Sequence, residues 1–174
     1  MIADAAALRD LSISYAACVD RLDGPGFGAL FVADGELWVP DAAHGYTPTI
    51  CIAGSAALER VPSGLARYHS TRHEVVRATY DGDSDGDSHG DSDGGGDRAT
   101  GEITGIAHHL SPAPVDPDGP AGRDPADLPG IDTVWYLRYV DEYRRGSDGW
   151  RIARRVLHLD RVEEQPVDRL GPGR

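Results

Sequence analysis

The sequence predicts an α+β domain in which helices come first and an antiparallel sheet follows. Apolar residues recur at helical spacing in the first third of the chain. The later segments are instead rich in β-branched and aromatic residues, which favour strands. The chain has 174 residues, which fits one domain, so we expect residues 1–174 to fold as a single unit.

Three helices are predicted before the sheet. Residues 4–22 place leucine, tyrosine and valine on one side at helical spacing, and a Gly-Pro pair ends this helix. A second, short helix is expected at 25–32, and a turn at Gly35 then leads into a strand. Residues 54–66 form the third predicted helix, although Pro62 weakens its continuity.

Four segments carry the signature of strands. They are rich in residues that favour strands and lie at 73–80, 99–109, 133–144 and 150–162. The last two are joined by a short Gly-Ser-Asp-Gly turn, which predicts a hairpin. We therefore expect an antiparallel meander.

Two insertions are predicted to be flexible. Residues 81–97 contain seven aspartates and no lysine or arginine, and 111–130 hold six of the twelve prolines. The first insertion begins like a calcium-binding EF-hand loop. However, Ser92 stands where that loop needs a bidentate glutamate. A solvated linker is the favoured interpretation of this insertion.

Charge excludes several classes of partner. The formal net charge is −12, and it would still be −5 without the seven aspartates of the first insertion. Nucleic-acid binding needs a basic surface, so we expect no nucleic-acid partner. Neither a membrane-spanning run nor a signal peptide is recognisable, and we expect a cytoplasmic protein without membrane association. Cys18 and Cys51 are expected to be two buried free thiols.

An aspartate, a histidine and a tyrosine are candidates for proton transfer. Asp20 lies near the C-terminal end of the first predicted helix, where an acid opposes the helix dipole. A solvated helix-end acid remains the alternative for Asp20, and a core position remains the alternative for Tyr15. His69 and His73 lie four residues apart, but the β-rich sequence after them argues against a helical zinc site, and no metal is expected.

The adjacent residues His108 and His109 lie in a predicted strand, so they should face opposite sides of the sheet. Periodicity does not decide which of the two faces inward. Neither a glycine-rich phosphate loop nor a nucleophile elbow occurs in the sequence. Two classes of function therefore remain: proton-transfer chemistry and binding.

The chain resembles the SnoaL-like proteins of the superfamily of nuclear transport factor 2, scytalone dehydratase and ketosteroid isomerase. The resemblance lies in the order and spacing of six short motifs across most of residues 8–160. They are Tyr-x4-Asp (15–20), Phe-x-Ala-Asp-Gly (31–35), Ile-x-Gly (52–54), Thr-x-His (71–73), Tyr-x-Asp-x-Tyr (139–143) and Gly-Trp-Arg-Ile-Ala-Arg-Arg (149–155).

This resemblance implies a cone, in which about three N-terminal helices pack on a strongly curved antiparallel sheet around a pocket. It also implies a small hydrophobic substrate and no cofactor. In dehydratase-like members a helix aspartate pairs with a sheet histidine, which corresponds here to Asp20 and His73. Tyr15 matches a tyrosine one turn before the aspartate, and a second histidine falls at His108 or His109.

The expected function is a cofactor-independent dehydratase, isomerase or polyketide cyclase acting on a small carbonyl compound. We assign catalysis to the residues Asp20, His73, Tyr15 and His108, and substrate contacts to the residues Trp38, Tyr139, Asp141 and His109. Two alternatives remain open: a ligand-binding or association module without catalysis, and the small structural subunit of a ring-hydroxylating oxygenase. Aromatic residues at 135, 139, 143 and 150 suggest a homodimer formed through the sheet.

Overall fold

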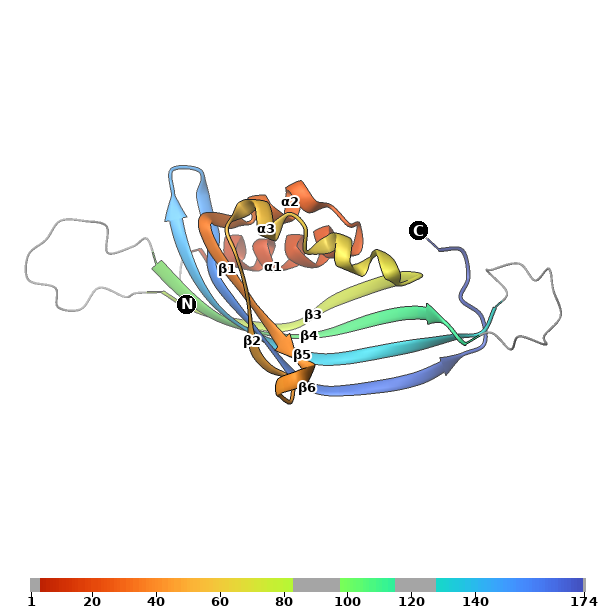
Figure 1. The fold of residues 1–174 in the computed structure, drawn as a ribbon. Coiled ribbons are helices and arrows are strands. Elements are labelled where there is room, and N and C mark those ends of the chain that lie inside the picture. The colour runs from red at the N-terminus through yellow and green to blue at the C-terminus, as the bar shows by residue number, and fades with distance from the viewer. Residues whose placement is uncertain (1–3, 83–97, 115–127, 174) are drawn as a thin grey trace, which may run out of the picture.

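The computed structural model describes residues 4–82, 98–114 and 128–173. In these residues the fold is α+β, with a six-stranded sheet and helices that all precede its last four strands. Figure 1 shows the helices lying in the hollow of a strongly curved sheet. The predicted fold class is therefore confirmed.

The helices follow the prediction with one correction. Helix α1 spans Ala5–Asp20, α2 spans Gly24–Ala29 and α3 spans only Ser55–Leu58. A 3₁₀ segment, η2, follows at Pro62–Arg67, and another, η1, lies at Ala42–His44. The single helix expected over 54–66 is wrong, because proline has no N–H to continue the α-helical hydrogen bonds and clashes with the preceding turn.

The strands, with their bounds, are β1 (Phe31–Asp41), β2 (Thr47–Ala53), β3 (Ser70–Gly82), β4 (Arg98–Pro112), β5 (Gly130–Gly146) and β6 (Gly149–Val167). Their order in the sheet is β2-β1-β6-β5-β4-β3. Strands β3 to β6 form the expected antiparallel meander, but β1 pairs with β6 in parallel, so the sheet is mixed. Strand β2 was not predicted, and β1 begins at Phe31, within the segment expected to be helical.

The strands reach further than the sequence pattern indicated. Strand β3 continues to Gly82, β4 to Pro112, and β5 begins at Gly130, so both expected insertions are shorter than predicted. Residues 83–97 and 115–127 lie outside the described residues, and so do the predicted linker behaviour and the calcium-loop comparison.

The core lies between the concave face of the sheet and the helices. Alternate residues of β4, among them Ile103 and Ala107, are fully buried there and meet Leu8 and Phe27 from the helices. Tyrosines 139 and 143 and Trp150 belong to this core, and Trp135 packs against it. These aromatic side chains are therefore covered within one chain and do not themselves require a second copy.

The two cysteines differ from the expectation. Both are free, but only Cys18 is buried, whereas Cys51 is exposed on β2. Strand β2 is the edge of the sheet and is mostly exposed, which explains the difference. Among the described residues, no helix has the length and apolar character needed to cross a membrane.

Candidate active site

Asp20 is the last residue of α1, and the start of β3 surrounds its carboxylate with donors. Its Oδ1 accepts hydrogen bonds from Thr71 Oγ1 at 3.0 Å and His73 Nδ1 at 2.7 Å, and its Oδ2 accepts from the backbone N–H of His73 at 2.9 Å. Burial would raise the pKa of Asp20, but these hydrogen bonds hold it below its ordinary value. Asp20 is therefore an ionised acceptor that fixes His73, and not a solvated helix-end acid.

His73 is held in one tautomer by this contact. A carboxylate can only accept, so the ring nitrogen Nδ1 donates and the neutral imidazole keeps its lone pair on Nε2. The His73 side chain is 12% exposed and lines the cavity described next. The predicted pairing of Asp20 with His73 is confirmed, and the geometry is that of an oriented base.

A cavity of about 560 Å³ opens beside His73, between the concave face of the sheet and the segment that carries α3 and η2. This volume lies within the usual range for small-molecule sites. The wall is mainly apolar and consists of Val19, Leu37, Val39, Ile52, Ala57, Val61, Gly64, Leu65, Trp135, Leu137 and Leu157. Its polar or charged members are Tyr15, Tyr139, His73, His109, Arg60 and Arg67.

His109 is the second histidine of this cavity. Its side chain is 1% exposed, and its ring lies 5.5 Å from that of His73 and 4.7 Å from that of Trp135, measured between centroids. Its Nδ1 lies 3.2 Å from the carbonyl oxygen of Thr133, so Nδ1 donates and Nε2 is left as an acceptor. Burial, with the nearby His73, lowers the pKa of His109 to about 4, so the ring is neutral near pH 7.

Tyr15 and Tyr139 meet at the cavity wall over a buried ion pair. Their rings lie 5.4 Å apart and enclose the guanidinium of Arg155, 4.2 and 4.4 Å from the two centroids. Arg155 donates to Asp141 at 2.6 and 2.9 Å, and both side chains are almost completely buried. Burial would lower the pKa of Arg155, but the charge of Asp141 raises it above its ordinary value.

Three predicted site residues lie elsewhere. His108 is on the outer face of the sheet, where its Nδ1 meets Asp132 at 2.7 Å, because neighbouring strand residues point to opposite faces. Trp38 also faces outward, and its indole N–H donates to Glu36 beneath Arg154. The catalytic assignment of His108 and the substrate contact of Trp38 are therefore wrong.

Asp141 does not reach the cavity either. Its carboxylate is 0% exposed and is fully engaged by Arg155 and by the hydroxyl of Tyr143, which donates at 2.5 Å. It belongs to the core beneath the site, so the predicted substrate contact is wrong. Sequence analysis did not single out Arg155, Arg60 or Arg67. Arg155 is the last residue of the Gly-Trp-Arg-Ile-Ala-Arg-Arg motif, but its pairing with Asp141 depends on a bulge in β5–β6 that the sequence does not reveal.

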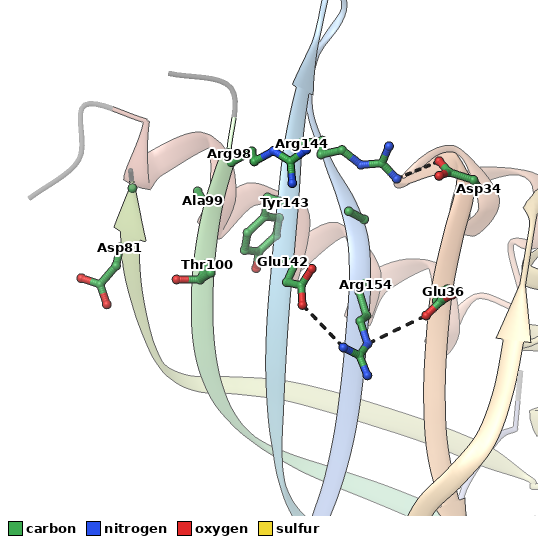
Figure 2. Close-up of a pocket in the computed structure, with 12 residues that line it drawn as sticks. Asp34, Glu36, Asp81, Arg98, Ala99, Thr100, Glu142, Tyr143, Arg144 and Arg154 are labelled. Carbon is green, nitrogen blue, oxygen red and sulfur yellow. Dashed lines mark hydrogen bonds and ion pairs between the residues drawn. The ribbon is translucent and has the colours of Figure 1, made fainter. Parts of the chain in front are cut away.

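Another hollow, of about 500 Å³, lies at the opposite end of the sheet (Figure 2). Its charged side chains largely neutralise one another. Arg154 lies between Glu36 and Glu142 at 3.9 and 3.6 Å, and Arg144 meets Asp34 at 2.8 Å. Among the described residues that line it there is no histidine, so we place the candidate site at the Asp20–His73 pair. Across the described part of the chain, no three histidine, cysteine, aspartate or glutamate side chains form a group that could hold a metal.

Comparison with known proteins agrees with this architecture. The profile of the SnoaL-like domain matches residues 1–156. Among curated proteins there is no match. A solved candidate scytalone dehydratase from Novosphingobium aromaticivorans is 18% identical, with 96% of this chain and 91% of that chain covered and a TM-score of 0.65.

Two further solved structures are similar. A hexachlorocyclohexane dehydrochlorinase of type 3 from Novosphingobium barchaimii is 13% identical, with 94% and 90% of the two chains covered and a TM-score of 0.61. An NTF2-like protein with a cystatin-like fold from Novosphingobium aromaticivorans is 21% identical, with 90% and 82% covered and a TM-score of 0.54. At these identities the likeness shows the fold.

Proposed function

We propose that this chain, which belongs to the SnoaL-like family, is a cofactor-independent acid–base enzyme of dehydratase, isomerase or polyketide cyclase type. Its substrate would be a small hydrophobic molecule with a carbonyl group. The observation that carries the proposal is the Asp20–His73 pair at the wall of a largely apolar cavity. A buried, oriented histidine facing a cavity is the usual arrangement of a general base.

In this mechanism the Nε2 atom of His73 takes a proton from the carbon next to the substrate carbonyl. The imidazole becomes an imidazolium, and the carboxylate of Asp20 stabilises the new positive charge at 2.7 Å. The proton then returns to the product, either to another carbon in an isomerase or to a leaving hydroxyl in a dehydratase. No outside oxidant or reductant is needed.

Tyr15 supplies the donor for the oxyanion. Burial raises the pKa of Tyr15 above its ordinary value, so the phenol keeps its proton near neutral pH. A phenol that lines the cavity can donate a hydrogen bond to the enolate oxygen as negative charge develops there. His109, neutral and with Nε2 as an acceptor, is suited to a substrate hydroxyl.

The similar structures support the same class of chemistry. Two of them are named a dehydratase and a dehydrochlorinase, that is, for elimination of water and of hydrogen chloride. Loss of water or of hydrogen chloride across a carbon–carbon bond removes a proton from carbon, and a general base can accept that proton. The alternative is a binding module, which would use the same apolar cavity without needing His73 as a base.

Proton abstraction can be tested before the substrate is known. A panel of compact cyclic and aromatic ketones, hydroxyketones and keto acids is incubated in deuterated buffer, and deuterium incorporation next to the carbonyl is followed by NMR. We expect the wild-type protein to exchange at least one compound, and His73→Ala to reduce the rate to the buffer background. Exchange that persists in His73→Ala, or no exchange with any compound, contradicts the proposal and favours the binding module.

A further inference from the structure

The cavity carries positive charge at its rim. Arg60, in the turn between α3 and η2, and Arg67, the last residue of η2, line the cavity and are exposed to solvent. The lining residues that the structure describes include no aspartate or glutamate. Within the described ranges neither arginine forms an ion pair with an acid, whereas eight other arginines of this acidic protein do.

Arg67 is connected to His73 by a series of contacts between neighbouring rings. Its guanidinium lies 4.8 Å from the centroid of Tyr68 and donates to the Tyr68 hydroxyl at 3.1 Å. Tyr68 in turn lies 4.9 Å from His109, which contacts His73. Only the ring of Tyr68 therefore lies between the guanidinium of Arg67 and His109, which lines the cavity beside His73. Arg67 also contributes to lowering the pKa of His109, which agrees with this proximity.

We infer that the substrate is a compact apolar anion, most simply a carboxylate, whose charged end meets Arg60 and Arg67 while its apolar body fills the cavity. The inference rests on the proposed function, because it names the substrate class of the same site. A guanidinium without an acidic partner at the mouth of an apolar cavity offers N–H donors that fit a carboxylate. The anion would be fixed at the rim, with its reacting carbon directed towards His73.

The distribution of charge also favours the binding of an anion over a neutral molecule. The protein has a formal net charge of −12, so an anion is repelled from most of its surface. Two arginines without acidic neighbours along the cavity wall make the mouth a local positive patch. A neutral molecule with the same apolar body gains nothing from this patch, so the rim discriminates between an acid and its amide.

The test compares 2-naphthoate with 2-naphthamide, two probes of the same shape that differ in charge. Binding is measured by calorimetry at low and at high salt for the wild-type protein, for Arg60→Gln, for Arg67→Gln and for the double variant. We expect naphthoate to bind more tightly than naphthamide. Each substitution should weaken naphthoate binding up to about fivefold, as for exposed ion pairs, and leave naphthamide unchanged. High salt should reduce the difference.

Two controls separate charge at the rim from net charge and from folding. Arg77→Gln removes one exposed charge from β3 at a position that does not line the cavity, and should leave both affinities unchanged. Arg60→Lys with Arg67→Lys should restore part of the preference for naphthoate. Circular dichroism confirms that each variant is folded.

Several outcomes would overturn the inference. They are equal wild-type affinity for the two probes, loss of naphthamide binding in parallel with naphthoate in the glutamine variants, and no saturable binding of naphthoate. The proposed function fails separately, through the deuterium exchange that depends on His73. His73→Ala should still prefer naphthoate, because the rim is intact. A protein that exchanges protons but shows no preference for the anion therefore loses only this inference.

Discussion

Two histidine–aspartate pairs lie on opposite faces of the same sheet, with the same separation of 2.7 Å between ring nitrogen and carboxylate. The inner pair, His73 with Asp20, lines the 560 Å³ cavity among apolar side chains. The outer pair, His108 with Asp132, borders a smaller hollow of about 270 Å³ among Ser70, Arg72 and Glu74. We therefore expect the surroundings of each pair, and not the hydrogen bond within it, to decide which histidine acts as a base.

The environments differ in how the carboxylate is satisfied. Asp20 receives hydrogen bonds at both oxygens, two of them independent of the His73 ring. The Oδ1 atom of Asp132 is buried and has no hydrogen-bond partner among the described residues, so this acid depends on His108. The outer pair is therefore expected to matter for stability and the inner pair for chemistry.

The largest expected effect on the exchange rate comes from replacing the acid of the inner pair. Asp20→Asn removes the charge that orients His73 and stabilises the imidazolium, and should lower the exchange rate by about 10²–10⁴-fold. Asp132→Asn should leave the rate within about twofold. Rates are compared in the same deuterium-exchange assay, and equal losses for the two variants would contradict the assignment.

The buried ion pair of Arg155 and Asp141 should affect the stability of the fold. Arg155→Met leaves Asp141 charged and unpaired in the core, and should lower the free energy of unfolding by about 3–5 kcal/mol. The double variant Arg155→Met with Asp141→Asn should recover part of this loss. Denaturant unfolding measures both, and a loss below about 1 kcal/mol in Arg155→Met would show that the pair contributes little to folding.

The neutral histidine of the inner wall predicts a dependence of stability on pH. The pKa of His109 in the fold is about 4, below its ordinary 6.5, so the unfolded chain binds more protons between these values. The contribution of His109 is complete above pH 6.5 and is lost as the pH falls towards 4, by roughly 3 kcal/mol at most. His109→Gln should flatten the stability profile in this window, measured by urea unfolding at several pH values. An unchanged slope would contradict the burial of a neutral ring.

The smallest expected effect concerns the outer face. Val140 is 41% exposed and pairs in register with Val156, next to the exposed ion pair of Arg138 and Asp160. A second copy packed on this face of the sheet would bury the Val140 side chain. We therefore still expect a homodimer through the sheet, weakened in Val140→Asp. Sedimentation should show a dimer at micromolar concentration, and a wild-type monomer would contradict this expectation.

The sequence predicted the elements better than it predicted which face each residue occupies. Strand residues at 99–109 were recognised from composition, and the spacing of the helix aspartate and the sheet histidine indicated their pairing through a family resemblance. The choice between His108 and His109 depended on the register of β4, which adjacent histidines do not reveal. In the structure His109 faces inward with the buried Ile103 and Ala107.

The positions of other residues were also not predictable from the sequence, because they too depend on strand register and local backbone geometry. Trp38 resembled a cavity aromatic, but β1 turns Leu37 and Val39 inward and leaves Trp38 outside. Asp141 resembled a substrate contact, yet its partner Arg155 lies across the hairpin in a register shifted by a bulge. Arg60 and Arg67 line the cavity on either side of Pro62, where the expected third helix is replaced by two short segments.

The most direct test of the account compares the two histidines in one experiment. Exchange rates of an active panel compound are measured for His73→Ala and His108→Ala under identical conditions, with thermal unfolding recorded for each. We expect the exchange rate of His73→Ala to fall to the background, whereas His108→Ala should keep the wild-type rate and be less stable, because Asp132 is left unpaired. Equal exchange rates in the two variants would contradict the claim that the surroundings make the inner pair the base.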